Sequence, residues 1–172
     1  MDWIPSNSAE QELIDVFEQN QSGLLGTLFF VVANVEDARD VLQDAFMKCW
    51  LHREELPDIQ NLRAWVYRIA LNTARDRRDS AWSRRRETLL GADPMLSPPD
   101  QSPEAVLLRD EELGLVRAAI LSLQPAEQEV FLLRQNGDLT YEDIAASTGM
   151  ALGTVKTRMR SALRKVREAV AE

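Results

Sequence analysis

The stretch LTYEDIAASTGMALGTVKTRMRSALRKVR, residues 139–167, predicts two helices joined by a short turn. Thr140 is followed three residues later by Asp143, so each side chain can bond the backbone N–H of the other and start a helix. Gly149 stands where that helix must end in a sharp turn, which a residue without a Cβ adopts at little cost. A helix-turn-helix is therefore expected here.

The second helix of this pair has an apolar face and a cationic face. Apolar residues recur at the helical period, at Val155, Met159, Ala162, Leu163 and Val166. The other side carries basic and hydroxyl groups, which bond guanine edges and phosphates in a DNA major groove. The residues predicted to contact DNA are Lys156, Thr157, Arg158, Arg160, Ser161 and Arg164. A basic face that meets only solvent is the alternative for the helix taken by itself.

Composition limits the class of protein. With 172 residues and 45% apolar content, the chain can form one medium domain or two small ones. No apolar run approaches the roughly 20 residues that span a bilayer, and the N-terminus has no basic segment followed by a hydrophobic one. A cytoplasmic protein without membrane insertion is expected. With one cysteine and one histidine, neither a disulfide frame nor a zinc site is expected, and no cofactor.

Charge is distributed unevenly along the chain. The net charge of −8 argues against a protein that simply coats DNA. Arginines nevertheless gather between residues 61 and 87, while acidic residues gather before residue 62 and between residues 93 and 112. This pattern is expected when some surfaces face nucleic acid and others face a basic protein partner.

An all-α fold with two small helical domains is expected. Helices are predicted from Ser8, through residues 24–32, from Asn34 to about residue 50, and from about residue 61 towards residue 85. Pro57 predicts a loop over residues 56–60. The third helix has an outer face that carries Asp37, Asp40, Gln43, Asp44 and Met47. The fourth projects Arg68, Arg75 and Arg78 outward, with Asn72 and Asp76 one turn apart on one edge.

Residues 87–103 contain four prolines and no helical pattern, which predicts an extended linker. The domains are then residues 8–86 and 104–172, and they are expected to move independently in the free protein. Limited proteolysis is expected to cut first between residues 91 and 102. The second domain is expected to begin with helices over residues 104–122 and from Pro125 to Gly137.

Three segments, in this order, resemble the extracytoplasmic-function (group IV) sigma factors of bacterial RNA polymerase, in the sigma-70 family. DARDVLQDAFMKCW, residues 37–50, resembles the region 2 helix that docks on the polymerase clamp coiled coil. NLRAWVYRIALNTARDRRDS, residues 61–80, resembles the segment that opens and reads the −10 element. Residues 139–167 resemble the region 4 helix-turn-helix that reads the −35 element.

This resemblance implies a sigma factor whose partners are core RNA polymerase, promoter DNA and an anti-sigma factor. Because the coiled coil is basic, it implies polymerase contacts for the acidic face that holds Asp37, Asp40, Gln43, Asp44 and Met47. It implies −10 contacts for Arg68, Asn72, Arg75, Asp76 and Arg78. Within that set, Asn72 and Asp76 would shape a pocket for a flipped base.

Other classes of protein stay open from the residues alone. A dimeric helix-turn-helix regulator that acts without polymerase explains residues 139–167 but leaves the pattern of residues 37–80 unexplained. An all-helical adaptor or anti-sigma protein would place the basic helix on an acidic partner. An enzyme is least favoured, because no carboxylate cluster or glycine-rich phosphate loop accompanies His52 and Cys49.

Overall fold

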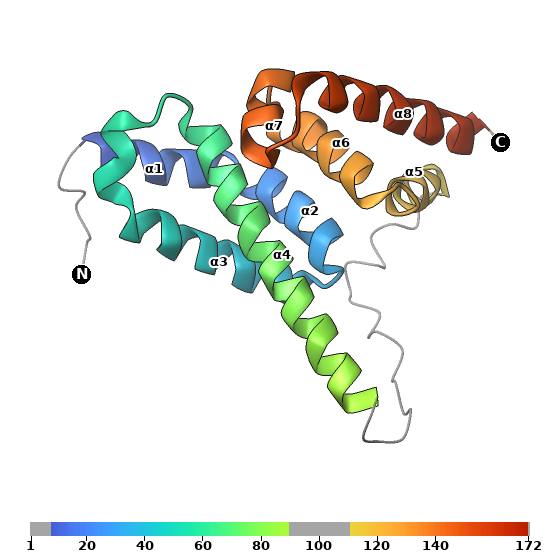
Figure 1. Ribbon diagram of the computed structural model, residues 1–172, viewed down its shortest axis with the longest axis horizontal. Coiled ribbons are helices and arrows are strands. Elements are labelled where there is room, and N and C mark those ends of the chain that lie inside the picture. The colour runs from blue at the N-terminus through green and yellow to red at the C-terminus, as the bar shows by residue number, and fades with distance from the viewer. Residues whose placement is uncertain (1–7, 90–110, 172) are drawn as a thin grey trace.

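The computed structural model describes residues 8–89 and 111–171, and its elements over those ranges are helical (Figure 1). The N-terminal elements are α1 Ser8–Gln19, α2 Gln21–Val32, α3 Val35–Leu51, the short 3-10 helix η1 Arg53–Asp58, and α4 Leu62–Leu89. The C-terminal elements are α5 Glu111–Leu121, α6 Pro125–Gly137, α7 Tyr141–Thr148 and α8 Leu152–Ala171. None of the helices described is both long enough and apolar enough to cross a membrane.

Local sequence signals set the helix ends as predicted. At the start of α3, the side chain of Asn34 accepts a hydrogen bond from the backbone N–H of Asp37 at 3.0 Å. At the start of α7, Thr140 and Asp143 each bond the other's backbone N–H. Gly149 ends α7 with φ of 75°. The predicted helix-turn-helix is therefore confirmed.

Two boundaries differ from the prediction. Pro57 lies inside η1 rather than in an open loop, because its fixed φ is compatible with a 3-10 helix. The closing bond of η1 runs from the N–H of Ile59 to the carbonyl of Leu56, so it needs no donor at Pro57. Helix α4 continues to Leu89, past the expected domain end at Arg86. The rest of the linker, the expected cleavage region and residues 104–110 lie outside the described residues.

Each half of the protein has its own layer of packed helices. In the N-terminal half, α3 packs against α4 and both contact α2. In the C-terminal half, α5 and α6 pack along α8, and the predicted stripe is buried there at Val155, Met159 and Ala162. Burying the apolar stripe of α8 fixes which of its faces is left for solvent.

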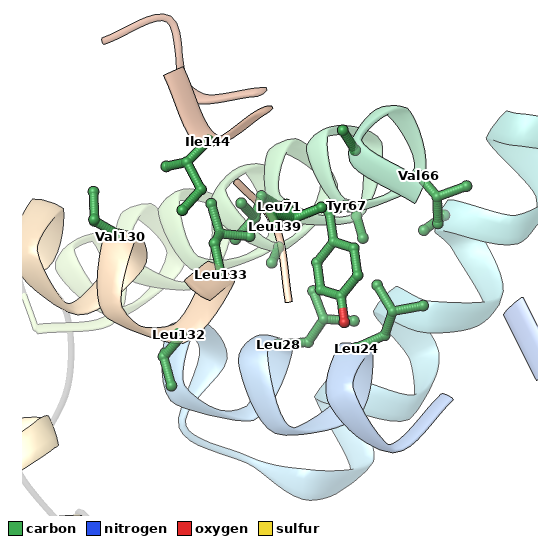
Figure 2. Close-up of a cluster of buried hydrophobic side chains, with 14 of the residues drawn as sticks. Leu24, Leu28, Val66, Tyr67, Leu71, Val130, Leu132, Leu133, Leu139 and Ile144 are labelled. Atoms are coloured by element: carbon green, nitrogen blue, oxygen red, sulfur yellow. The ribbon is translucent and has the colours of Figure 1, made fainter. Parts of the chain in front are cut away.

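The two halves lie against each other, which differs from the independence expected from the linker. Helix α6 packs on α2, and α7 packs on α4 (Figure 1). Figure 2 shows Tyr67 of α4 reaching toward Leu24 and Leu28 of α2, with Leu133 and Leu139 approaching from the other half. These residues belong to one continuous core. The contact forms because apolar surface on both halves leaves water together.

Candidate nucleic-acid interface

Helix α8 turns most of its predicted DNA contacts to solvent. The exposed members of the set are Lys156, Thr157, Arg160 and Arg164. Thr157 donates its hydroxyl to the carbonyl of Gly153 at 2.9 Å, and Arg164 lies 3.8 Å from Glu168. An exposed ion pair of this kind contributes little, so it holds Arg164 only weakly. This face can therefore meet phosphates and base edges.

The other two members of the set are half-buried, which corrects the expected place of Ser161 on the outer face. Arg158 is partly covered, and Ser161 donates its hydroxyl to Oε1 of Glu127 on α6 at 2.7 Å. The reason is that Glu127 is buried and needs hydrogen-bond donors. In this structure Ser161 links α8 to α6.

Glu127 fixes the orientation of α8. Nζ of Lys165 donates to both carboxylate oxygens, at 3.0 and 2.8 Å. Burial by itself would raise the pKa of Glu127, but the hydrogen bonds from Lys165, Ser161 and the backbone of Gln124 outweigh burial and lower the pKa. The carboxylate therefore stays charged at neutral pH and holds α8 on α6.

Helix α4 carries the second cationic surface. The predicted contacts that are exposed along it are Arg68, Asn72, Asp76 and Arg78. Arg75 is only half-buried and forms an ion pair with Glu129 of α6. Burial and the nearby charge of Arg78 lower the pKa of Arg75, against the opposing effect of Asp79. The guanidinium of Arg75 is thus held by the carboxylate of Glu129 within the protein.

The distal part of α4 carries an exposed aromatic side chain. Trp82 is 64% exposed. Arg78 precedes it and Arg86 follows it by one helical turn, so all three share a face. In Figure 1, α4 extends well beyond the helices that cover its first half. Trp82 is therefore a surface group and not a core residue.

A cavity of about 420 Å³ opens beside α4, α3 and η1. It is lined by Lys48, His52, Glu55, Trp65, Ile69, Asn72 and Thr73. Nζ of Lys48 donates to the hydroxyl of Thr73 at 3.1 Å and so joins α3 to α4. Asn72 lines this cavity, whereas Asp76 is not among its lining residues. The structure thus brings one of the two expected pocket residues to a hollow.

The outer face of α3 is acidic, as predicted. Of the predicted polymerase contacts on this face, Asp40, Gln43, Asp44 and Met47 are exposed, while Asp37 is half-buried. Arg77 of α4 reaches across to Asp37 at 2.8 Å and to Asp40 at 3.3 Å. The hydrogen bond that Arg77 donates to the carboxylate of Asp37 raises the pKa of Arg77. Arg77 thus partly neutralises the negative charges of Asp37 and Asp40. Asp44 is the acidic residue of this face nearest the C-terminal end of α3.

An apolar groove between α1, the start of α2 and α3 borders this acidic face. Its lining residues are Phe17, Glu18, Gln21, Leu42, Gln43, Phe46 and Met47. Met47 is 54% exposed at its edge. The sequence does not predict this groove, because helical periodicity gives the face of one helix and not the gap between helices.

Known protein families match both halves of the chain. The family described as sigma-70 region 2 matches residues 16–84, and the one described as sigma-70, region 4 matches residues 113–166. The RNA polymerase sigma-H factor of Pseudomonas aeruginosa is 33% identical over 147 residues, which cover 81% of this chain and 76% of that protein. The ECF RNA polymerase sigma factor RpoE of Cereibacter sphaeroides is 31% identical, over 94% of this chain and 86% of that protein.

Two solved structures share the fold. The sigma factor RpoE in complex with the anti-sigma factor NepR, from Bartonella quintana, has a TM-score of 0.65 at 23% identity, over 94% of this chain and 96% of that chain. CnrH in complex with the cytosolic domain of CnrY has a TM-score of 0.64 at 21% identity, over 96% of this chain and 90% of that chain. The family matches in both halves and the two relatives at 33% and 31% identity lead to one conclusion: the chain belongs to the extracytoplasmic-function branch of the sigma-70 family of RNA polymerase sigma factors.

Proposed function

We propose that this protein docks on core RNA polymerase and directs promoter-specific initiation, reading the −35 element with α8 and opening the −10 element with α4. The observation that carries the proposal is the presence of two separate cationic helices and one acidic helix face in a chain that matches sigma regions 2 and 4. Residues 8–86 act as the region 2 domain, residues 87–103 as the linker and residues 104–172 as the region 4 domain. Its action then takes place in the cytoplasm, with the polymerase.

The acidic face of α3 is the proposed polymerase contact. A basic coiled coil is attracted by Asp37, Asp40 and Asp44, and the attraction steers docking more than it adds affinity. The apolar groove beside Met47 supplies surface that such a helix can bury, with hydrophobic contact giving the larger free energy. Charge and groove together fit an amphipathic, basic helical partner.

The two DNA-reading roles divide between α8 and α4. On α8, Thr157 and Arg160 are proposed to contact base edges, and Lys156, Arg158 and Arg164 to contact phosphates. On α4, the exposed Arg68 and Arg78 are proposed to hold the −10 backbone, and the cavity that Asn72 lines is proposed to receive an extruded base. Arg75 joins this set when it is released from Glu129. Asp76, which lies on the same edge of α4 as Asn72, is also proposed to contact the −10 element.

An anti-sigma factor is the proposed regulatory partner. The solved relatives RpoE and CnrH are bound by NepR and by the cytosolic domain of CnrY. The apolar groove and the acidic face of α3 would be covered by any protein that blocks polymerase docking there. A dimeric regulator that works without polymerase has no use for these surfaces, which is why it is the less favoured function.

Transcription by reconstituted polymerase tests the function. Purified protein mixed with core polymerase is expected to give transcripts from promoters that core polymerase alone does not use. The combined variant Gln43→Ala with Asp44→Lys is expected to lose this activity, because it reverses charge at the groove edge without touching buried residues of α3. Measured affinity for core polymerase should fall in parallel.

The matched control is Glu12→Lys, an exposed charge reversal on α1. It should leave transcription and polymerase affinity unchanged, and both variants should keep the far-ultraviolet circular dichroism of the parent. Undiminished polymerase binding by the α3 double variant would show that this face is not the docking surface.

Base reading by α8 can be separated from phosphate binding. Arg160→Ala is expected to relax preference at one or two positions of the −35 element and to cost about 1 to 3 kcal/mol. Arg164→Ala, one turn further on, should weaken binding to all sequences alike. A panel of promoter variants measured with the polymerase complex distinguishes them. Unchanged base preference in Arg160→Ala would remove this residue from the base-reading set.

A further inference from the structure

The two halves of the protein meet at a built contact between α2, α4 and the end of α6. The hydroxyl of Tyr67 on α4 donates to the backbone carbonyl of Asn136 at 3.2 Å. The side-chain amide of Asn136 donates to the hydroxyl of Thr27 on α2 at 3.5 Å. Tyr67 and Thr27 are both buried, and both bond Asn136 of the opposite half, while the hydroxyl of Thr27 also donates to the carbonyl of Gly23 in its own helix at 2.9 Å.

Glycines allow this close approach. A Cβ on Gly23 of α2 would lie 2.4 Å from the backbone oxygen of Asn136 and 2.7 Å from the hydroxyl oxygen of Tyr67. A Cβ on Gly137 would lie 3.2 Å from the ring of Tyr67. Inside a helix, glycine is less favourable than alanine by about 1 kcal/mol. Gly23 therefore lowers the stability of α2. A larger residue at this position would collide with the backbone of Asn136 in the other half.

Charged groups surround the glycine contact. Arg75 of α4 pairs with Glu129 of α6, whose side chain is 10% exposed. Arg63 donates to the backbone carbonyl of Asp138 at 3.1 Å. Removing one member of an ion pair is costly when the other member is nearly buried, because the remaining charge stays desolvated and unpaired. The contact therefore combines shape, hydrogen bonds and charge.

We propose that the face of α2 and α4 around Gly23, Thr27 and Tyr67 is the docking site for this chain's own C-terminal half, and that this closed form competes with DNA reading by α4. Closure engages Arg75 with Glu129, so its guanidinium is not available to a phosphate. Closure also sets α7 beside α4, where Arg68 and Ser147 line one cavity. A ligand that binds only the open form is weakened by the fraction of protein that is closed.

The competition rests on the proposed function, but the closure does not. Closure is tested directly by fluorescence energy transfer between two dyes attached at Asp58→Cys and Glu142→Cys, both exposed positions. Their neighbours Gln60 and Asp143 line a common cavity in the closed form, so energy transfer should be high. Cys49 does not compete for dye, because it is fully buried and burial raises its pKa to about 12.

Gly23→Ala is the variant that opens the contact. It changes no residue assigned to DNA or polymerase, and alanine favours the α2 helix. Gly114→Ala in α5 is the matched control, because a Cβ there meets nothing within 4 Å. Transfer in the free protein should be high for the parent and the control and clearly lower for Gly23→Ala.

Adding Glu129→Lys to Gly23→Ala, which sets like charges against Arg75, should lower transfer further. Low transfer in the parent would overturn the proposal. So would high transfer that survives in the Gly23→Ala, Glu129→Lys double variant, since the named contacts would then not hold the halves together.

Competition is tested with a single-stranded DNA 20-mer of random sequence and unlabelled free protein. Gly23→Ala should bind it several-fold more tightly than the parent or Gly114→Ala, and adding Arg75→Ala should remove the gain. Equal affinity of Gly23→Ala and the parent would overturn competition. Transcription with core polymerase is read separately: loss of promoter-dependent transcripts in parent and variants alike would reject the proposed function, while energy transfer still decides closure.

Discussion

Replacing Tyr67 with alanine is expected to lower the free energy of unfolding by about 3 to 5 kcal/mol, the range for removing a buried aromatic. Tyr67 is only 1% exposed and lies between α2 and the C-terminal half (Figure 2). Because small proteins are stable by about 5 to 15 kcal/mol, this loss is a large share of the total. Urea unfolding followed by circular dichroism measures it.

Tyr67→Phe is the matched control, since it keeps the ring and removes the hydroxyl. Burial raises the pKa of Tyr67 to about 12, although Arg63 acts in the opposite direction, so the hydroxyl is a hydrogen-bond donor at neutral pH. Losing its bond to the carbonyl of Asn136 should cost about 1 kcal/mol. Equal losses for Tyr67→Ala and Tyr67→Phe would mean that the ring contributes no core packing.

Core polymerase is expected to raise the affinity of this protein for a promoter by roughly 10² to 10⁴-fold. The free protein has a net charge of −8 and two cationic surfaces that a linker joins, so each surface binds duplex DNA weakly. Docking replaces the packed arrangement of the two halves by the spacing of the two promoter elements, which turns two weak contacts of α4 and α8 into one bivalent contact. Polymerase also supplies free energy for strand opening, since extruding a base costs a few kcal/mol.

A gel-shift titration at physiological salt, with and without core polymerase, measures this gain. The Gln43→Ala, Asp44→Lys variant is the internal control, because it should show the weak binding of the free protein even when polymerase is present. Tight, sequence-specific duplex binding by the protein alone, unchanged by polymerase, would contradict the sigma-factor function and favour the dimeric regulator.

The sequence by itself determined where the helices lie and several of their ends. The Thr140 and Asp143 capping pair, the αL position of Gly149 and the Asn34 cap are local hydrogen bonds and backbone preferences, which involve residues within one turn of each other. The apolar stripe of α8 is likewise a local pattern, so the outward direction of Arg160 could be predicted from it. The order of three motifs indicated the family, which the matches to both regions then showed.

Only the tertiary structure decided which polar groups are free and how the halves meet. Ser161 and Arg75 look exposed on helical projections, but Glu127 and Glu129 of α6 engage them from a distance in sequence that periodicity does not encode. The groove beside Met47 exists only where α1, the start of α2 and α3 come together. The role of Gly23 depends on a backbone carbonyl more than a hundred residues away, at Asn136. Helical sequence patterns report one element's own faces, whereas these features arise where two elements, each with its own direction, come together.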